Sequence, residues 1–127
     1  MDNLSSTLNS IKIADHKGLR TVATRPYSSF LNRVLGVMKD AGYIGEFEKV
    51  EDGQGSQLKI SLVGKVNDCG SIRPRHPVKA VDIEAYEERF LPAKGVGLMV
   101  ISTPNGIISH IEAKEKKIGG RLLAYVY

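Results

Sequence analysis

The sequence predicts an α+β protein built from two small lobes. Stretches with apolar residues at helical spacing are interleaved with stretches in which apolar and polar residues alternate. The chain has 127 residues, a length typical of one domain or of two small lobes that share a core. A polar stretch bounded by glycines, residues 64–70, lies in the middle. We therefore place an N-terminal α/β lobe over residues 1–64 and a mainly β C-terminal lobe over residues 65–127.

The first helix of the N-terminal lobe is expected over residues 2–13. Its apolar positions recur at helical spacing, and Asp2 or Asn3 caps its start. These apolar residues are Leu4, Leu8 and Ile11. The opposite face carries one cation among small hydrogen-bonding side chains, namely Ser6, Asn9, Ser10 and Lys12. Such a face is either solvated or in contact with phosphate and sugar oxygens, to which these side chains can donate hydrogen bonds.

The second helix, over residues 28–41, is the best-defined element of the sequence. Apolar residues recur at the spacing i, i+3, i+4 and i+7, which defines one buried face of a helix. These residues are Leu31, Val34, Leu35 and Met38, flanked by Phe30, Val37 and Ala41. Ser28 or Ser29 is expected to cap the start, and Gly42 to take the left-handed conformation at the end.

Three strands are expected beside these helices. Residues 15–18 form a turn, residues 19–24 alternate loosely as a strand does, and Pro26 ends that strand. Residues 43–50 form the second strand, and the two glycines within residues 51–55 indicate a turn. In the third strand, the apolar residues Leu58, Ile60 and Leu62 alternate with Lys59 and Ser61. A three-stranded sheet with the helices on one face is the economical arrangement.

The C-terminal lobe is expected to be mainly β with a short helix. The prolines within residues 71–79 exclude a helix there and favour an extended segment at a sheet edge. Residues 84–89 form one helical turn, which a leucine–proline pair ends, and residues 96–101 form a buried strand. Residues 103–106 then form a tight turn, with proline at its second position and glycine at its fourth.

The chain ends in a capped helix and a strand. Ser109 and Glu112 form the capping box of a short helix over residues 111–117, and a pair of glycines stops that helix. Residues 121–127 form the last strand. Its alternation places Leu122, Ala124 and Val126 on one face and Leu123, Tyr125 and Tyr127 on the other.

The composition argues against several classes of protein. Hydrophobic residues make up 42% of the chain and charged residues 25%, which is ordinary for a globular protein and argues against disorder. No apolar run approaches the ~20 residues of a membrane-spanning helix. The first residues contain neither a basic segment nor the apolar core of a secretion signal. The single cysteine, Cys69, forms no intrachain disulfide. We therefore expect a cytoplasmic protein without a membrane partner.

No motif of a catalytic, cofactor or metal site is found in the sequence. The glycines lack the spacing of a phosphate-binding loop or of a dinucleotide fingerprint. His16, His76 and His110 lie on separate segments, which does not suit a metal site. Nothing near Cys69 would lower the pKa of its thiol, so we do not expect it to act as a nucleophile. We expect no catalysis, no cofactor, no metal and no small-molecule substrate.

The charge permits a polyanionic partner, since the formal net charge is +4 and the isoelectric point is near 9.2. Tryptophan is absent and aromatic residues make up 6%, so a surface built on base-stacking aromatics is not expected. One pattern does suit RNA, because a buried strand runs into Ser102 and Thr103, whose hydroxyls and turn amides would stand together. Small donors in a rigid loop can follow a sugar-phosphate backbone closely. A turn that only closes a hairpin has the same pattern, so both interpretations are open.

Several ordered motifs along the whole chain resemble one family. They are residues 102–108, the run Gly119-Gly120-Arg121, residues 124–127, Ser29, residues 31–38 and 42–47, and residues 72–75, 77–79 and 89–92. Together they resemble the universal family of ribosomal protein number eight of the small subunit. The middle motifs are similar to those of the archaeal and eukaryotic branch, and the ending is similar to that of archaeal members.

The resemblance implies a fold of two packed lobes and a structural function in the small ribosomal subunit. Members of the family bind small-subunit rRNA at a helix of the central domain that has an irregular, base-paired core. Binding helps that domain to fold during assembly. The resemblance therefore implies rRNA and neighbouring small-subunit ribosomal proteins as partners.

The RNA-binding positions of the family fall on particular residues of this chain. They are the loop Ser102, Thr103, Pro104, Asn105 and Gly106, the run Gly119, Gly120 and Arg121, the helix face Asn9, Ser10 and Lys12, and Ser29. The chain departs from the family pattern at Pro104, which removes one hydroxyl, and at Phe30, which replaces a lysine. Arg33, one turn later, is expected to supply that charge. Short donors suit the shallow minor groove of A-form RNA.

Two other functions are compatible with parts of the sequence. A protein-interaction module would use an exposed strand edge within residues 73–79 to extend the sheet of a partner. A small hydrolase would need a nucleophile beside a base, and the sequence offers no convincing pair of this kind.

Overall fold

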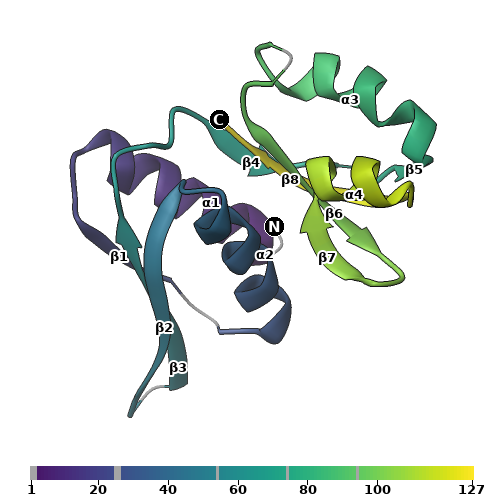
Figure 1. Cartoon of the computed structure of the whole chain (residues 1–127). Coiled ribbons are helices and arrows are strands. Elements are labelled where there is room, and N and C mark those ends of the chain that lie inside the picture. Colours follow the sequence, from purple (N-terminus) through teal and green to yellow (C-terminus); the bar gives the residue numbers. More distant parts are fainter. Residues whose placement is uncertain (1–2, 25–26, 54, 74, 94) are drawn as a thin grey trace.

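The computed structural model describes residues 3–24, 27–53, 55–73, 75–93 and 95–127. The expectations that concern Asp2, Pro26 and Pro74 fall outside the described residues. The chain forms the predicted α+β fold of two lobes, with two antiparallel sheets (Figure 1). Helices α1 and α2 lie between the sheets, and helices α3 and α4 cover the other face of the second sheet. Their bounds are given below.

The first lobe contains two helices and a three-stranded sheet. Its elements are α1 (Asn3–His16), β1 (Thr21–Thr24), α2 (Ser29–Asp40), β2 (Ile44–Asp52) and β3 (Gly55–Leu62). The strand order is β1-β3-β2, and both pairs are antiparallel. Leu58 and Ile60 of β3 are buried against the helices, while Lys59 between them is exposed. The predicted arrangement of this lobe is confirmed.

Helix α1 is longer than the sequence predicts. The predicted apolar face is buried, but the buried stripe continues to Ala14, and the helix includes Asp15 and His16, where a turn was expected. Tertiary contacts explain the extra length. Asp15 Oδ2 accepts the N–H of Val66 at 2.8 Å, and His16 Nε2 lies 2.7 Å from the carbonyl oxygen of Asn67.

Helix α2 begins and ends as predicted. Ser28 is its N-cap, and the hydroxyl oxygen of Ser28 accepts the N–H of Leu31 at 3.1 Å. At the other end, Gly42 has φ +84°, a conformation that glycine adopts without strain. The N–H of Tyr43 then donates to the carbonyl oxygen of Met38 at 3.0 Å. The apolar face of this helix is buried over its whole length.

The hairpin between β2 and β3 is tighter than predicted. Strand β2 includes Glu51 and Asp52, and β3 begins at Gly55, whereas the sequence predicts a turn over residues 51–55. Glu51 pairs with Ser56, and Asp52 pairs with Gly55. Pairing across the strands satisfies the backbone groups of these polar residues, so it overrides their preference for a turn.

The second lobe is built around a five-stranded antiparallel sheet. Its elements are β4 (Cys69–Ser71), β5 (Pro77–Val78), the 3₁₀ turn η1 (Ala80–Asp82), α3 (Ile83–Phe90), β6 (Leu98–Thr103), β7 (Gly106–Ser109), α4 (His110–Lys116) and β8 (Gly120–Val126). The order is β4-β8-β6-β7, and β5 pairs with β8 as well. The segment around Pro77 therefore lies at the sheet edge, as predicted.

Three elements of this lobe differ from the prediction. The single turn expected at residues 84–89 belongs to a longer helical stretch, from η1 through α3, because Ile83 anchors that stretch in the core. Strand β6 begins later than expected, after Gly97 with φ +94°, and it continues through Thr103. Helix α4 ends where Lys117 takes the left-handed conformation at φ 57°. The prediction that the glycine pair stops this helix is wrong.

Strand β8 contains a bulge that the predicted alternation does not include. The register between β6 and β8 shifts between Val100 and Ile101, which leaves Leu123 as an extra residue. The predicted assignment of Leu122 and Leu123 to faces is therefore wrong, because the bulge shifts the alternation by one position. The observed groups are Leu122, Tyr125 and Tyr127 on one side and Leu123, Ala124 and Val126 on the other.

One hydrophobic core extends across both lobes. Helices α1 and α2 pack against the first sheet on one side and against Leu98, Val100 and Val126 of the second sheet on the other. A second core lies between the second sheet and helices α3 and α4. The lobe boundary after residue 64 stays a prediction, and Val66, just beyond it, belongs to the shared core. Among the described residues, no helix is long and apolar enough to cross a membrane.

Candidate nucleic-acid interface

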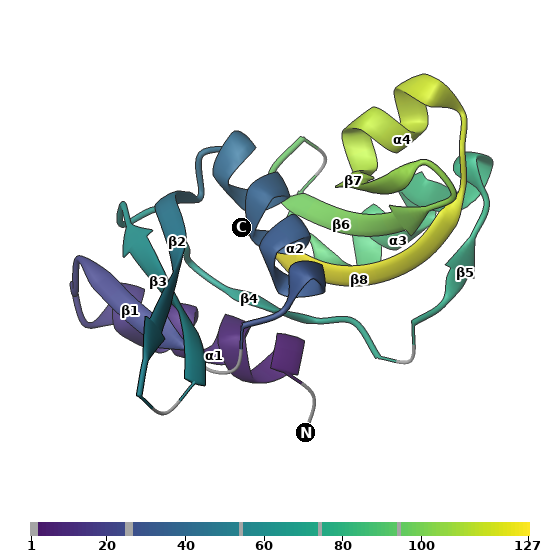
Figure 2. The same ribbon diagram turned by 90° about the horizontal axis from the view of Figure 1, so that it is seen from below.

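The start of α2 meets the edge of the second sheet at Arg75. The Arg75 guanidinium lies 5.2 Å from the centre of the Phe30 ring, in the first turn of α2. The carbonyl oxygen of Arg75 accepts a hydrogen bond of 3.3 Å from Nη1 of Arg121, near the start of β8. Figure 2 shows the segment between β4 and β5 passing below β8, on the same side as the first turn of α2. This segment of the second lobe therefore contacts the first lobe at the surface, through Arg75 and Phe30.

Arg33 extends this group along α2. Arg33 and Phe30 are three residues apart, and residues at that spacing are neighbours on a helix surface. We call Arg33, Arg75 and Arg121 the arginine cluster. All three are exposed, as is Ser29 in the same turn of α2. Within the described ranges none of the three forms an ion pair with a carboxylate, so their charge is available to a polyanion.

The hairpin between β6 and β7 forms the tight turn that the sequence predicts. Thr103 pairs with Gly106, and Pro104 and Asn105 occupy the turn. The Thr103 hydroxyl donates to the carbonyl oxygen of Gly106 at 2.8 Å and accepts the N–H of Asn105 at 3.2 Å. Gly106 has φ +120°, which other residues rarely adopt. The one proton of the Thr103 hydroxyl is thus used to stabilise the turn.

Ser102 and Thr103 do not present their hydroxyls together. Successive side chains of a strand point to opposite faces, and β6 continues through Thr103, so the two hydroxyls do not stand together as expected. Ser102 pairs with Arg121 across β6 and β8, which places it beside the arginine cluster. The Ser102 hydroxyl is partly exposed and forms no hydrogen bond with the described part of the chain. It is therefore the free hydroxyl of this pair.

The glycine pair allows three strands to approach closely. A Cβ at Gly120 would lie 2.1 Å from the carbonyl oxygen of Ser102, and a Cβ at Gly119 would lie 2.3 Å from that of Val78. Close-packed interiors do not contain approaches this short. The two glycines thus let β8 start between β5 and β6, and they set the position of Arg121 relative to Ser102. A direct contact of the glycine pair with RNA stays a prediction.

The polar face of α1 contacts the second lobe. Lys12 Nζ lies 2.9 Å from Asp68 Oδ1, just before β4. The hydrogen bond from Lys12 lowers the pKa of the Asp68 carboxyl, and the same bond raises the pKa of Lys12. Both groups therefore stay charged as a pair, and the first role of Lys12 is at the lobe interface. Asn9 is exposed and Ser10 is partly exposed, so Asn9 is the most accessible of the three predicted contacts on α1.

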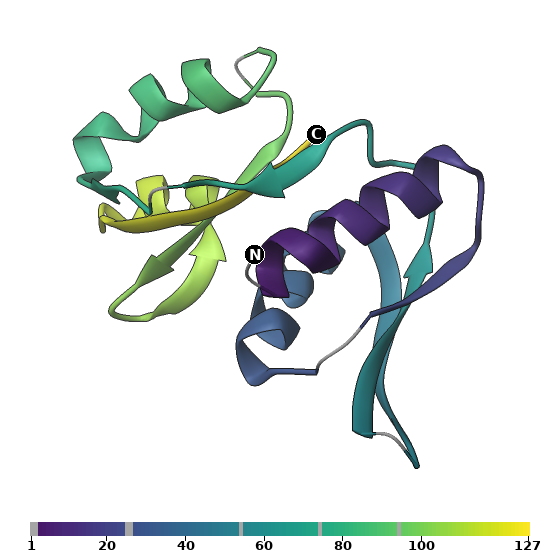
Figure 3. The same ribbon diagram turned by 180° about the vertical axis from the view of Figure 1, so that it is seen from behind.

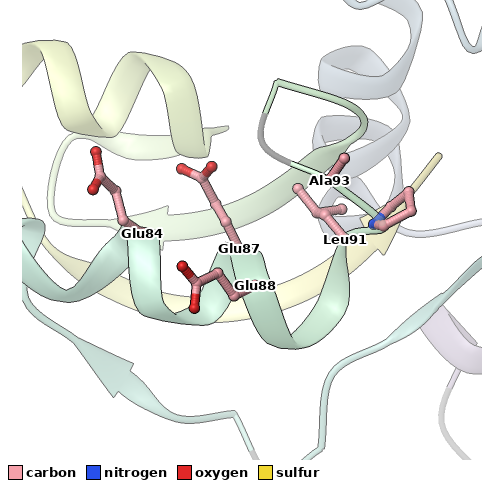
Figure 4. Close-up of a pocket in the computed structure, with 6 residues that line it drawn as sticks. Glu84, Glu87, Glu88, Leu91 and Ala93 are labelled. Atoms are coloured by element: carbon pink, nitrogen blue, oxygen red, sulfur yellow. The ribbon is translucent and has the colours of Figure 1, made fainter.

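A hollow beside α3 has the opposite charge. Figure 4 shows Glu84 and Glu87 pointing to the same side of α3. The residues that line the hollow are Glu84, Glu87, Glu88, Leu91, Pro92 and Ala93. Glu87 is buried and forms an ion pair with Lys114, while His110 Nε2 lies 3.6 Å from the Glu87 carboxylate. Carboxylates repel phosphate, so RNA is not expected on this side of the second lobe.

The described residues offer neither a cluster of metal-ligating groups nor a reactive thiol. No group of three His, Cys, Asp or Glu side chains in the described ranges could hold a metal ion. The thiol of Cys69 is buried and donates to the carbonyl oxygen of Leu8 at 3.2 Å. Burial raises the pKa of the Cys69 thiol to about 12, so this thiol is not a nucleophile at neutral pH.

Sequence reasoning did not single out Arg75 as a contact residue, although residues 72–75 contribute to the family resemblance. The signal that could have found it is a cation in a segment that prolines keep out of a helix, because such a segment lies at an exposed edge. Its contact with Phe30 depends on the packing of the two lobes, and its hydrogen bond with Arg121 depends on the pairing of β5 with β8. No local pattern contains either of these.

A comparison with known protein families agrees with the motifs found along the chain. Residues 2–127 match the family model described as Ribosomal protein S8. The matched range includes both lobes and thus the arginine cluster, the β6–β7 hairpin and the glycine pair.

Proposed function

This chain belongs to the ribosomal protein S8 family, and from that premise we propose that it binds a helix in the central domain of small-subunit rRNA and assists the folding of that domain. The family consists of structural ribosomal proteins. The chain is accordingly a constituent of the small ribosomal subunit in the cytoplasm, where it binds rRNA and neighbouring ribosomal proteins.

The observation that supports the proposed site is the arginine cluster with the free hydroxyl of Ser102 beside it. Arginine forms paired hydrogen bonds with phosphate oxygens. The wide, shallow minor groove of A-form RNA displays 2′-hydroxyls that a small donor such as Ser102 can reach. The cluster therefore supplies attraction to the backbone, and Ser102 supplies a contact that depends on the shape of one RNA.

The remaining predicted contact residues either position Ser102 or add to the proposed interface. The hydrogen bonds of the turn from Thr103 to Gly106 fix the end of β6. In this proposal the turn positions Ser102 for its contact with RNA. Ser29 and Arg33 lie on α2 and Asn9 lies on α1, so the first lobe contributes to the proposed interface as the second lobe does. Packed elements from both lobes suit recognition by shape, because the lobes need not be ordered relative to each other on binding.

Titrations of two RNAs test the role of Ser102. One RNA is a central-domain helix with its irregular core, and the other is a regular duplex of equal length. Ser102→Ala should weaken binding to the first RNA by about 1–2 kcal/mol, because one donor is lost and its RNA partner stays unpaired. Binding to the regular duplex should hardly change. Thr103→Ser keeps the hydroxyl that stabilises the turn and serves as the matched control, with affinity near that of the wild type. Equal losses on both RNAs would show that Ser102 is not a recognition element.

Salt dependence tests the arginine cluster. The logarithm of the association constant should fall linearly with the logarithm of salt concentration, with a slope of roughly −3 to −5 for a few neutralised phosphates. Arg75→Gln should weaken both RNAs by similar factors and make the slope shallower by about one. Lys59→Gln removes the same charge from the exposed face of the first sheet and should leave the slope unchanged. A wild-type titration without salt dependence would refute phosphate contact.

A further inference from the structure

A row of aromatic rings follows one side of α3 and continues onto β8. The ring centres of His76 and Tyr86 are 5.9 Å apart, those of Phe90 and Tyr125 are 6.0 Å apart, and those of Tyr125 and Tyr127 are 6.2 Å apart. The Arg89 guanidinium lies between the first pair and the rest, 5.5 Å from the Tyr86 ring and 5.6 Å from the Phe90 ring. We call this set the aromatic row: His76, Tyr86, Arg89, Phe90, Tyr125 and Tyr127.

The aromatic row is accessible from outside. Its five rings are all partly exposed, and Arg89 is exposed. The residues beneath it, such as Ile83 and Leu122, are completely buried. Figure 3 shows α3 beside the segment that leads from β4 to β5, with β8 next to that segment. The rings therefore cover the second core and also form part of the surface, although they come from three separate segments of the chain.

Helix α3 separates the aromatic row from the acidic hollow. At about 100° per residue, Tyr86 lies roughly 160–200° around the helix from Glu84 and Glu88. On the side of the row, the exposed Arg89 contributes a positive charge that lies against the rings. The carboxylate that touches the far end is Asp68, which accepts a hydrogen bond of 3.3 Å from the Tyr127 hydroxyl and is paired with Lys12.

We propose that the aromatic row binds an unpaired base of single-stranded RNA, with the base stacked against Arg89 and the neighbouring rings. Bases stack on tyrosine, phenylalanine and histidine rings and on the plane of the arginine guanidinium. Arg89 already lies over two rings, so a base that joins this stack meets planar groups of the right kind.

The charge and the position of the row favour RNA over an uncharged apolar ligand. Single-strand sites combine stacking surfaces with cations that follow the backbone. Here the row begins at His76, directly after Arg75 of the arginine cluster, so the two surfaces meet at the edge of the second sheet, where Arg75 contacts α2 on one face and His76 contacts α3 on the other. This inference rests on the proposed function, in which the arginine cluster binds an RNA duplex. Unpaired nucleotides that flank this duplex would lie closest to the His76 end of the row.

A fluorescent single-stranded probe tests the inference directly. The probe is a hexanucleotide of uridines with 2-aminopurine at a central position, whose fluorescence is quenched when the base stacks on a ring. The wild-type protein should quench it in a saturable titration at about 0.1 M salt. Arg89→Gln should weaken this binding about fivefold or more, the low end of what one stacked base contributes. Because Arg89 is exposed, this variant leaves the core intact.

Two further variants complete the test. Tyr86→Leu removes a ring but keeps apolar volume, and it should reduce the quenching to a similar degree, with its urea midpoint measured to confirm folding. Lys59→Gln removes one charge from the first lobe and should change affinity by less than about twofold. Wild-type protein that does not quench the probe would overturn the inference, as would equal losses in Arg89→Gln and Lys59→Gln.

The same variants separate this inference from the proposed function. Tyr86→Leu should bind the regular duplex as the wild type does. Arg89→Gln should bind it nearly as well, with only the small loss in affinity that the removal of one positive charge causes. Normal duplex binding without quenching of the single strand would overturn the base site alone. If the wild-type protein shows no salt-dependent binding to the duplex, that result would instead contradict the assignment of the arginine cluster as the duplex site.

Discussion

Replacement of Gly120 by alanine is expected to destabilise the protein, although the added side chain is only a methyl group. The new Cβ would lie 2.1 Å from the carbonyl oxygen of Ser102. Carbon and carbonyl oxygen atoms on adjacent strands are about 3.3–3.6 Å apart. The strands β6 and β8 would therefore have to separate by about 1 Å at a point where both are fixed by pairing between Ser102 and Arg121.

The expected size of the effect follows from two opposing contributions. Extra volume in a packed interior costs roughly 1–3 kcal/mol, and here the obstacle is backbone, which cannot rotate away. Alanine also reduces the freedom of the unfolded chain, which offsets about 0.4–1 kcal/mol. We expect a net loss of about 1–2 kcal/mol in the free energy of unfolding. Because Ser102 and Arg121 flank the clash, binding to the rRNA helix should weaken as well.

Urea unfolding followed by far-ultraviolet circular dichroism measures this loss, and Gly36→Ala is the matched control. Gly36 lies within α2, and a Cβ there would have no atom within 4 Å outside its own helix. Alanine is favoured over glycine in a helix interior by roughly 0.5–1 kcal/mol, so the control should be more stable than the wild type. A Gly120→Ala protein as stable as Gly36→Ala would refute the close approach of β8 to β6.

Three further predictions concern stability. Leu35 is 1% exposed in the shared core, so Leu35→Ala should lower the free energy of unfolding by about 2–5 kcal/mol, and an unchanged urea midpoint would show that α2 is not packed there. Burial lowers the pKa of His110 below its usual 6.5, so the unfolded state binds more protons as the pH falls. The stability that neutral His110 contributes should be complete above about pH 6.5 and decrease below it; His110→Asn, which keeps an acceptor for the N–H of Met99, should lose this part of the pH dependence of the urea midpoint. Lys117 has φ 57°, so Lys117→Gly should raise the unfolding free energy by about 0.5–1 kcal/mol, and a decrease would contradict the left-handed cap.

The elements that could be predicted are those whose signals are local. The apolar spacing of α2 and its two caps lie within residues 28–42, and the turn from Thr103 to Gly106 depends on proline and glycine at fixed positions. In both cases the residues that define the element lie within one short stretch of the chain. Local propensity and tertiary packing favour the same structure there, so the local sequence pattern predicts it correctly.

The elements that could not be predicted depend on distant partners. Helix α1 continues to His16 because Asp15 meets Val66, fifty-one positions away in sequence. The bulge at Leu123 arises from the pairing of β8 with β6, and alternation within β8 alone gives no sign of it. The same limit applies to the candidate sites, since the arginine cluster and the aromatic row each combine three segments. A composition with 6% aromatic residues indicates few rings and not where those rings gather.

Helix α2 links the stability of the protein to the proposed interface. Its buried face, with Leu31 and Leu35, fixes the helix between the two sheets, and its exposed face presents Ser29 and Arg33. The other members of the interface come from the second lobe, which packs on the far side of the same core. Elements that are already fixed relative to one another avoid the cost of ordering the lobes on binding. The shared core is therefore what allows separate cations and one hydroxyl to act as a single surface complementary in shape to an RNA helix.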